Sequence, residues 1–238
     1  MEGRLVTRAV WEANGGAVDE AALAGRPCFG GLDLSGKHDL TSLTLVFPGG
    51  DPEAPSYDIV QRFWTPLGAM AQRPVREQDL FRQWIAAGFI TGLDGPVIRY
   101  RQMARELARL QDSYEIRAVA YDAWRIEAFE LDMEEAGVTG LPLVKFGQGW
   151  RSMAPAVEFF VECALGGRLR HGNHPVLTAC IVNAVTVSDP AGNLKVDKAR
   201  SRRPGMTRID GAITTIMALG AAQTYTPPPV IDVRAMIG

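Results

Sequence analysis

The sequence predicts an α/β fold in which one mixed sheet has helices on both faces. Apolar, partly alternating segments follow one another over residues 28–35, 40–48 and 57–66, which is typical of neighbouring strands, the first two paired antiparallel. Beyond residue 78 helical periodicity alternates with short apolar runs, and the run at 116–122 is typical of a strand buried on both faces. Neighbouring strands followed by alternating helices and strands indicate a mixed sheet.

The remaining elements follow from periodicity and turn residues. Helices are expected over 78–88, 100–114, 124–137, 154–167, 174–185 and from about 207 to 222, with a further strand at 141–149. An added β-hairpin is expected at 185–197, before the last helix, because Asp189-Pro190 and Gly192-Asn193 supply its turn. The mixed pattern of residues 1–26 indicates a linker or lead-in, which leaves a domain at 27–226 and a C-terminal tail at 227–238.

Length and composition are those of an ordinary globular protein. The 238 residues are 47% hydrophobic and 22% charged, enough to bury a substantial core. No run approaches the ~18 apolar residues that span a bilayer. The N-terminus lacks the apolar centre of a signal peptide, so we expect a cytoplasmic protein, in the host cytoplasm if it is encoded by a virus or prophage. Cys28, Cys163 and Cys180 are widely separated in apolar surroundings, which predicts buried thiols.

The stretch GGLDLSGKHDLTS, residues 30–42, allows two interpretations. Gly31, followed five residues later by Gly-Lys, fits most of the phosphate-cradling pattern G-x-x-x-x-G-K-[ST]. However, leucines lie inside the supposed loop, His38 stands where the pattern needs a hydroxyl, and a strand follows in place of a helix. We therefore interpret the stretch as a strand with Asp33 between core leucines, and expect no ATP binding from it. A solvent-facing or turn-capping Asp33 is the alternative.

Two further aspartates lie where ligands are often bound. Asp122 ends the strand at 116–122, and open α/β sheets gather their ligands at the carboxyl ends of strands. Asp210 is expected in the first turn of the last helix, beside the buried face marked by Ile213 and Met217. A helix N-cap for Asp122 and a favourable dipole contact for Asp210 are the structural alternatives. Together with Asp33, these residues could converge on a pair of divalent metal ions.

Such a site suits phosphodiester hydrolysis. Two Mg²⁺ or Mn²⁺ ions about 3.5 to 4 Å apart activate a water and stabilise the leaving 3′ oxygen. Hard cations of this kind prefer carboxylate ligands. Asp39 is a possible fourth acid, although capping of its own turn explains it as well. His171 and His174 form an isolated pair without further ligands, which does not favour a zinc site.

A local basic segment lies between the hairpin and the last helix. The net charge of −2 gives no global attraction for nucleic acid, so DNA binding would need such a patch. Between residues 195 and 208 the sequence has six positively charged residues and one negatively charged residue, Asp197, which gives a local charge of +5. The positively charged residues are Lys195, Lys198, Arg200, Arg202, Arg203 and Arg208. A basic loop beside the aspartates would contact phosphates without reading bases. A solvated charged loop without a function is the alternative.

The order of elements resembles the ribonuclease H-like nuclease fold. The local amino-acid sequence resembles the nuclease domain of the large terminase subunit of tailed bacteriophages. Four blocks over residues 25–222 carry this resemblance: GGLDLSGKHDLTSLTLVFP, AVAYDAWR, the segment from MAPAVEFFVECALGG to KVDKARSR, and RIDGAITTIMALGAA. It implies that Asp33, Asp122 and Asp210 are catalytic, metal-binding residues, with Asp33 bridging two ions. It also implies an endonuclease that cuts double-stranded DNA with little sequence preference while concatemeric phage genomes are packaged.

In that family an ATPase motor domain normally precedes the nuclease, and a small terminase subunit and the portal complete the assembly. The phosphate cradle and acidic strand of such a motor are not found in this sequence. We therefore expect either an excised C-terminal domain or a stand-alone relative. Two other functions stay open: another ribonuclease H-like enzyme, such as a junction resolvase or an RNA-strand nuclease, and a non-catalytic DNA-binding or portal-docking module.

Overall fold

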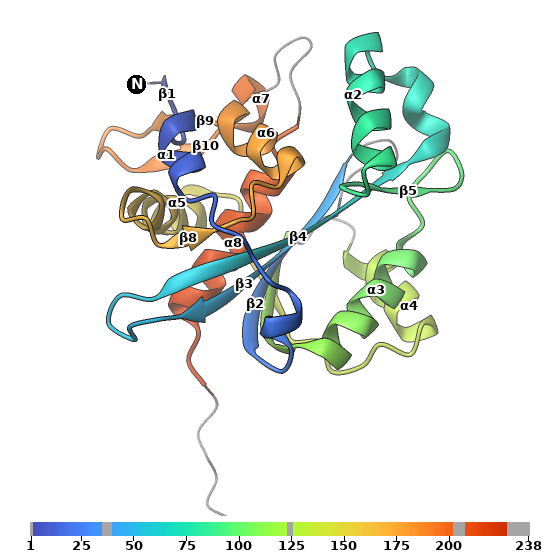
Figure 1. Cartoon of the computed structure of the whole chain (residues 1–238), viewed down its shortest axis with the longest axis horizontal. Coiled ribbons are helices and arrows are strands. Elements are labelled where there is room, and N and C mark those ends of the chain that lie inside the picture. The colour runs from blue at the N-terminus through green and yellow to red at the C-terminus, as the bar shows by residue number, and fades with distance from the viewer. Residues whose placement is uncertain (1, 35–39, 123–125, 202–207, 228–238) are drawn as a thin grey trace, which may run out of the picture.

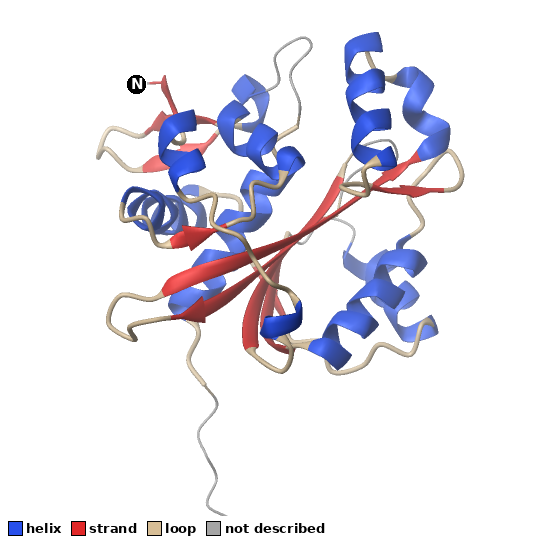
Figure 2. Cartoon of the chain, in the orientation of Figure 1, coloured by secondary structure: helices blue, strands red, loops and turns tan. Residues whose placement is uncertain are grey.

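The computed structural model describes residues 2–34, 40–122, 126–201 and 208–227, which fold around one large mixed sheet (Figures 1 and 2). Its strands in this part of the chain are β2 (Pro27–Asp33), β3 (Thr41–Gly49), β4 (Ser56–Pro66), β5 (Thr91–Leu93), β6 (Glu115–Tyr121), β7 (Leu143–Lys145) and β8 (Leu169–Arg170). They lie in the order β5-β4-β3-β2-β6-β7, and β8 pairs with β4. β3 is antiparallel to both β2 and β4, whereas β6 is parallel to β2 and β7 to β6. The predicted mixed sheet is confirmed.

Helices cover both faces of this sheet (Figure 1). One face carries α3 (Tyr100–Ser113) and α4 (Ile126–Glu135). On the other face α8 (Asp210–Thr224) lies directly on β2 and β3, and α5 (Trp150–Leu165) and α6 (Pro175–Asn183) pack against α8. Side chains of β2 alternate between two cores: Phe29 belongs to the core under α8, and Leu32 to the core under α3 and α4. The central strand therefore anchors both layers.

Three further helices and two 3-10 segments complete the described helical structure. These are α1 (Arg8–Ala13), α2 (Val75–Ala86) and α7 (Lys198–Ser201), with 3-10 turns at Ala21–Leu23 and Leu67–Gln72. Within the described ranges, none of the helices has the length and apolarity needed to cross a membrane.

A second, smaller sheet brings the N-terminal segment onto the body of the fold. β9 (Val185–Ser188) and β10 (Leu194–Val196) form the predicted hairpin, and β1 (Glu2–Arg4) pairs antiparallel with β9. Trp11 of α1 is fully buried, and its indole nitrogen donates to Thr178 Oγ1 at 3.0 Å. Strand pairing and burial thus tie the described residues of the segment expected as a linker or lead-in, 1–26, to the rest of the chain. The domain boundaries at 27 and 226 stay predictions.

Several helix ends differ from those that periodicity indicates. α5 begins at Trp150, ahead of the expected 154, and includes Pro155. The buried side chains of Met153 and Val157 explain this, since their packing outweighs the missing N–H of proline. α6 ends at Asn183 because β9 begins two residues later. The strand expected over 141–149 is shorter, at Leu143–Lys145, and α8 begins at Asp210.

The cysteines are buried, as predicted. Cys28 lies in β2, Cys163 in α5 and Cys180 in α6, and none is more than 1% exposed. Burial raises the pKa of Cys28 to about 12 and that of Cys163 to about 11, and it raises the pKa of Cys180 as well. Neutral thiols of this kind act as small hydrophobic side chains.

A glycine permits the contact between α8 and β2. A Cβ on Gly31 would clash with the backbone oxygen of Thr214 and would lie 2.9 Å from the backbone nitrogen of Ala218. These are backbone atoms of a helix, so they cannot turn aside as a side chain would. Thr214 Oγ1 lies 2.9 Å from Ser42 Oγ and 2.7 Å from Thr44 Oγ1, both on β3. This buried contact fixes the position of α8 along the sheet.

We expect Gly31→Ala to lower the free energy of unfolding by about 2 kcal/mol or more, because the added methyl group forces α8 away from β2. Gly3→Ala is the matched control: its Cβ would meet nothing closer than Thr186 Oγ1 at 3.6 Å, so a change within about 0.5 kcal/mol is expected. Urea unfolding followed by circular dichroism measures both. Equal stability of the two variants would contradict this account of the contact.

Candidate metal centre

Asp33 and Asp122 lie at the same edge of the main sheet. β2 and β6 are parallel neighbours, and Leu32 stands opposite Tyr121 in their register. Asp33 and Asp122 are the next residue on each chain, so they leave adjacent strands side by side. Asp33 is 7% exposed, and Asp122 is half-buried. The sequence-based expectation that ligands gather at strand ends thus brings these two together.

The start of α8 adds Asp210 to this edge. Asp210 is the first residue of the helix, one turn before Thr214. Thr214 contacts Ser42, and Ser42 pairs with Asp33 across β2 and β3. A Cβ on Gly211 would lie 2.8 Å from the ring of Phe63, which also pairs with Ser42. Both contacts place the N-terminal turn of α8 level with Asp33.

Lys198 lies among the aspartates. Its Nζ donates a hydrogen bond to Asp33 Oδ2 at 2.9 Å. Burial alone would lower the pKa of Lys198, but the carboxylates of Asp33, Asp210 and Asp122 more than offset it, so the pKa is raised. Asp33 contacts the ammonium group directly, and the charges of Asp210 and Asp122 act on the same group. That the three aspartates bind metal together stays a prediction.

The donor set suits a divalent cation with hard-oxygen preferences. The residues that surround the ammonium offer carboxylate oxygens, which Mg²⁺ and Mn²⁺ prefer, and the thiols lie in the cores. Among the residues described, no three His, Cys, Asp or Glu side chains are already arranged around a common metal position. The lysine ammonium lies beside one of the carboxylate oxygens, Asp33 Oδ2. Asp39, the possible fourth acid, lies outside the described residues.

The basic residues predicted to contact DNA take different positions. Lys198 forms an ion pair with Asp33. Lys195 Nζ lies 5.0 Å from the ring centroid of Trp150, and Arg200 is exposed and pairs with Asp197 at 3.6 Å. Arg208 is half-buried two residues before Asp210, whereas residues 202 and 203, both arginines, lie outside the described part of the chain. The role of Lys198 at the aspartates was missed in the sequence, since its partner is 165 residues away.

The other sequence motifs have structural roles. Gly31 is paired on both sides, with Thr44 and Ala120, so in this structure it belongs to a strand and not to a phosphate-binding loop. His171 stacks on Trp11 with ring centroids 3.8 Å apart. His174 caps α6 by accepting a hydrogen bond from the backbone nitrogen of Leu177 at 3.4 Å. Neither histidine has the surroundings of a zinc ligand among the described residues.

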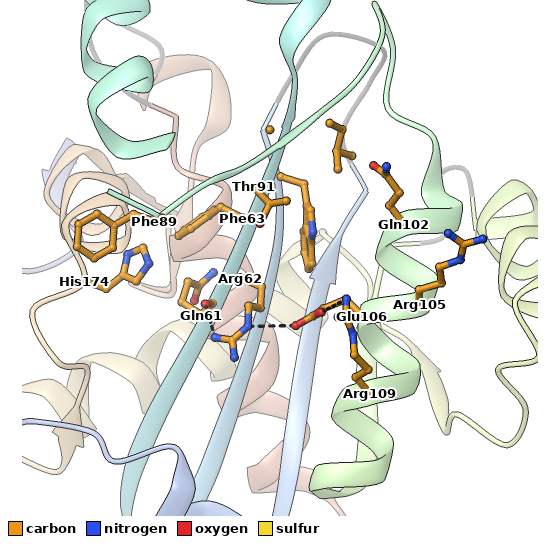
Figure 3. Close-up of a pocket in the computed structure, with 14 residues that line it drawn as sticks. Gln61, Arg62, Phe63, Phe89, Thr91, Gln102, Arg105, Glu106, Arg109 and His174 are labelled. Atoms are coloured by element: carbon orange, nitrogen blue, oxygen red, sulfur yellow. Dashed lines mark hydrogen bonds and ion pairs between the residues drawn. The ribbon is translucent and has the colours of Figure 1, made fainter. Parts of the chain in front are cut away.

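A pocket of about 530 Å³ lies between β4, β5 and α3, apart from the aspartates (Figure 3). Arg62 extends from β4 toward α3 and lies 3.5 Å from Glu106; it also donates to Glu20 at 3.0 Å. His174 and Phe89 face one another at the other side of the pocket. Burial, reinforced by the positive charge of Arg62, lowers the pKa of His174 to about 4.

Solved structures with the same fold include a phage terminase nuclease. The crystal structure of the large terminase nuclease from thermophilic phage G20c with bound magnesium superimposes with a TM-score of 0.51 at 11% identity, over 91% of this chain and 97% of that chain. At this identity the likeness concerns the fold alone. The mixed sheet with helices on both faces is thus the fold of a solved terminase nuclease.

Closer relatives identify the family within this class. The model of the "Terminase large subunit, endonuclease domain" matches residues 1–225, and the chain belongs to this family. The large terminase subunit of Enterobacteria phage HK97 is 36% identical over 218 residues, which are 92% of this chain and 41% of that protein. The crystal structure of the HK97 large terminase superimposes with a TM-score of 0.82 at 36% identity, over 93% of this chain and 44% of that chain. This chain therefore spans less than half the length of these relatives.

We expect His174 to make the protein less stable in mild acid. The unfolded chain takes up a proton near pH 6.5 whereas the folded chain does so only near pH 4, so stability falls as pH drops through this window. Between pH 7 and pH 5 the contribution of His174 to this loss is about 2 kcal/mol. His174→Asn keeps a helix-capping oxygen but does not titrate, so it should lose that much less. Urea unfolding at both pH values tests this, and equal losses would rule it out.

Proposed function

We propose that this domain is a metal-dependent endonuclease that cleaves double-stranded DNA with little sequence preference, as part of the cutting of concatemeric viral DNA during genome packaging. The observation that supports it most strongly is that Asp33 at the end of β2, Asp122 just after β6 and Asp210 at the start of α8 lie at one edge of the sheet, where the Lys198 ammonium binds Asp33. Membership of the terminase endonuclease family supports DNA as the substrate. Aspartates held this close repel one another unless positive charge compensates them, which favours metal binding.

The three aspartates take different roles in this proposal. Asp33, the most buried and central of the three, would be shared by two Mg²⁺ or Mn²⁺ ions, and Asp122 and Asp210 would each hold one of them. When bound, such ions supply an activated water and stabilise the leaving 3′ oxygen. The protein contributes rigidity: β2 and β6 are hydrogen-bonded neighbours, and the contact at Gly31 holds α8. The magnesium-bound structure of the similarly folded G20c nuclease is consistent with this use of the fold.

The DNA-binding surface in this proposal follows the hairpin and the segment after it. Lys195 and Arg200 lie on either side of Lys198, and Arg208 comes just before Asp210. Arg202 and Arg203 belong to the same proposal from their place in the sequence. Cations of this kind contact phosphates, which every DNA sequence offers equally, so they account for little sequence preference.

The partners of this domain follow from its relatives. The large terminase of HK97 is more than twice as long as the part matched here. We propose that the domain works with an ATPase motor domain, a small terminase subunit and the portal. The motor would move the DNA, and this domain would cut it.

We expect Asp33→Asn, Asp122→Asn and Asp210→Asn each to reduce DNA cleavage by about a hundredfold or more, the scale of losing one electrostatic contact at a reacting centre. The fold should survive, since asparagine has the same shape. Relaxation of a supercoiled plasmid in Mg²⁺ or Mn²⁺ measures cleavage, and circular dichroism checks folding.

Asp189→Asn is the control for these variants, because this carboxylate lies in the hairpin turn, where it accepts from the backbone nitrogen of Asn193 and asparagine can do the same. It should cleave at the wild-type rate. Any of the three aspartate variants that also does so would be misassigned. A wild-type protein that cleaves only branched DNA or RNA hybrids would instead indicate a resolvase or an RNA-strand nuclease, and one that binds DNA without cutting it a docking module.

We expect Lys195→Gln combined with Arg200→Gln to weaken binding about equally for unrelated DNA duplexes. Each lost phosphate contact should lower the slope of log K against log salt by about 0.9. Binding is measured in Ca²⁺, in place of Mg²⁺, at several salt concentrations. Arg117→Gln is the control, since Arg117 lies on β6 near the strand end away from Asp122 and pairs with Glu115. An unchanged slope in the double variant would show that DNA binds elsewhere.

A further inference from the structure

Lys198 reaches the aspartates from a separate part of the fold. It is the first residue of α7, and both flanks of this helix are tied to β9: the backbone nitrogen of Asp197 donates to Val185 O, and that of Val185 donates to Ser201 Oγ, each at 2.9 Å. The Lys198 side chain then crosses from the small sheet to Asp33 of the large sheet. The backbone of Lys198 is thus attached to the small sheet and its ammonium group to the large sheet, so the side chain connects the two.

The side chain has a route to solvent, unlike its partner. The Lys198 side chain is 39% exposed, whereas that of Asp33 is 10% exposed. A lysine has a flexible four-carbon stem, so its ammonium can leave the carboxylates without any movement of α7. Asp33 is held in a central strand, so its carboxylate cannot move with the departing ammonium.

Lys198 offers one positive charge and contacts one oxygen of Asp33. A divalent cation supplies more charge and accepts several carboxylate oxygens at once. A metal held by Asp33 would coordinate its carboxylate oxygens, and Lys198 already holds one of them, Oδ2. The lysine and a metal ion would therefore compete for this carboxylate.

We propose that Lys198 is a built-in competitor of the divalent metal: its ammonium holds the aspartates together in the metal-free protein and is displaced when metal binds. This inference rests on the metal site proposed above. Two consequences follow. Lys198 stabilises the metal-free fold, and it raises the metal concentration at which the site fills. Lys198 is thus a positioning residue for the carboxylates, not only a DNA contact.

Calorimetric titration of Mn²⁺ into Lys198→Met tests the competition without any cleavage assay. Methionine keeps an unbranched stem of similar length but removes the charge. We expect Mn²⁺ to bind roughly threefold tighter or more than to the wild type, and the melting temperature in EDTA to fall. Lys198→Arg, which keeps the charge, should show smaller changes in both quantities. Lys195→Met is the matched control, because that lysine belongs to the same segment but lies over Trp150, and its Mn²⁺ affinity should not change.

Amine labelling of the unmutated protein tests displacement directly. Acetylation by an N-hydroxysuccinimide ester, followed by peptide mass spectrometry, gives the labelling rate of each lysine. Mn²⁺ should raise the rate at Lys198 and leave that at Lys195 unchanged. In Asp210→Asn, which lacks one proposed metal ligand, the increase should shrink.

The outcomes separate this inference from the proposed function. Wild-type protein that takes up no Mn²⁺ would overturn the metal site and this inference with it. Mn²⁺ binding with equal or weaker affinity in Lys198→Met, or labelling of Lys198 that does not respond to Mn²⁺, would overturn the competition and leave the metal site standing. The labelling experiment needs no variant, so it decides the matter even if Lys198→Met fails to fold.

Discussion

The contact between α8 and β2 is the constraint on which the rest of the site depends. Asp33 lies two residues after Gly31 on the same face of β2, and Asp210 lies one helical turn before Thr214. Because Gly31 has no side chain, the two backbones approach until these carboxylates share one edge of the sheet. A larger residue at position 31 would separate α8 from β2. Each aspartate would then keep its place in its own strand or helix but would no longer lie near the other aspartates.

The same geometry places carboxylates that repel one another at one edge of the sheet. Grouping carboxylates where solvent is largely excluded is unfavourable without positive charge nearby. The positive charge comes from an element that is far away in the sequence, since Lys198 follows the β9-β10 hairpin and Asp33 ends β2. The hairpin therefore positions Lys198 at the aspartates, and it also carries Lys195 of the proposed DNA-binding surface.

The sequence predicted the parts of this fold that are long and locally encoded. Strands β2, β3, β4 and β6, the hairpin and the main helices carry alternation, periodicity or turn residues, and Asp33, Asp122 and Asp210 follow from where those elements end. β1, β5 and β8 are only two or three residues long and depend on distant partners, so no local pattern marks them. The Lys198 contact was missed for the same reason: in the sequence this lysine is one cation of a basic run.

The buried thiols allow the two cores to be observed separately. Cys28 belongs to the core under α3 and α4, whereas Cys163 and Cys180 belong to the core under α8. Each thiol is protonated and shielded in the folded state, so it reacts with an alkylating reagent only when its own layer opens. The rate at Cys28 thus reports opening of one side of the sheet, and the rates at the other two report opening of the side that holds Asp210. The native chain carries its own probes of whether these layers open together or one at a time.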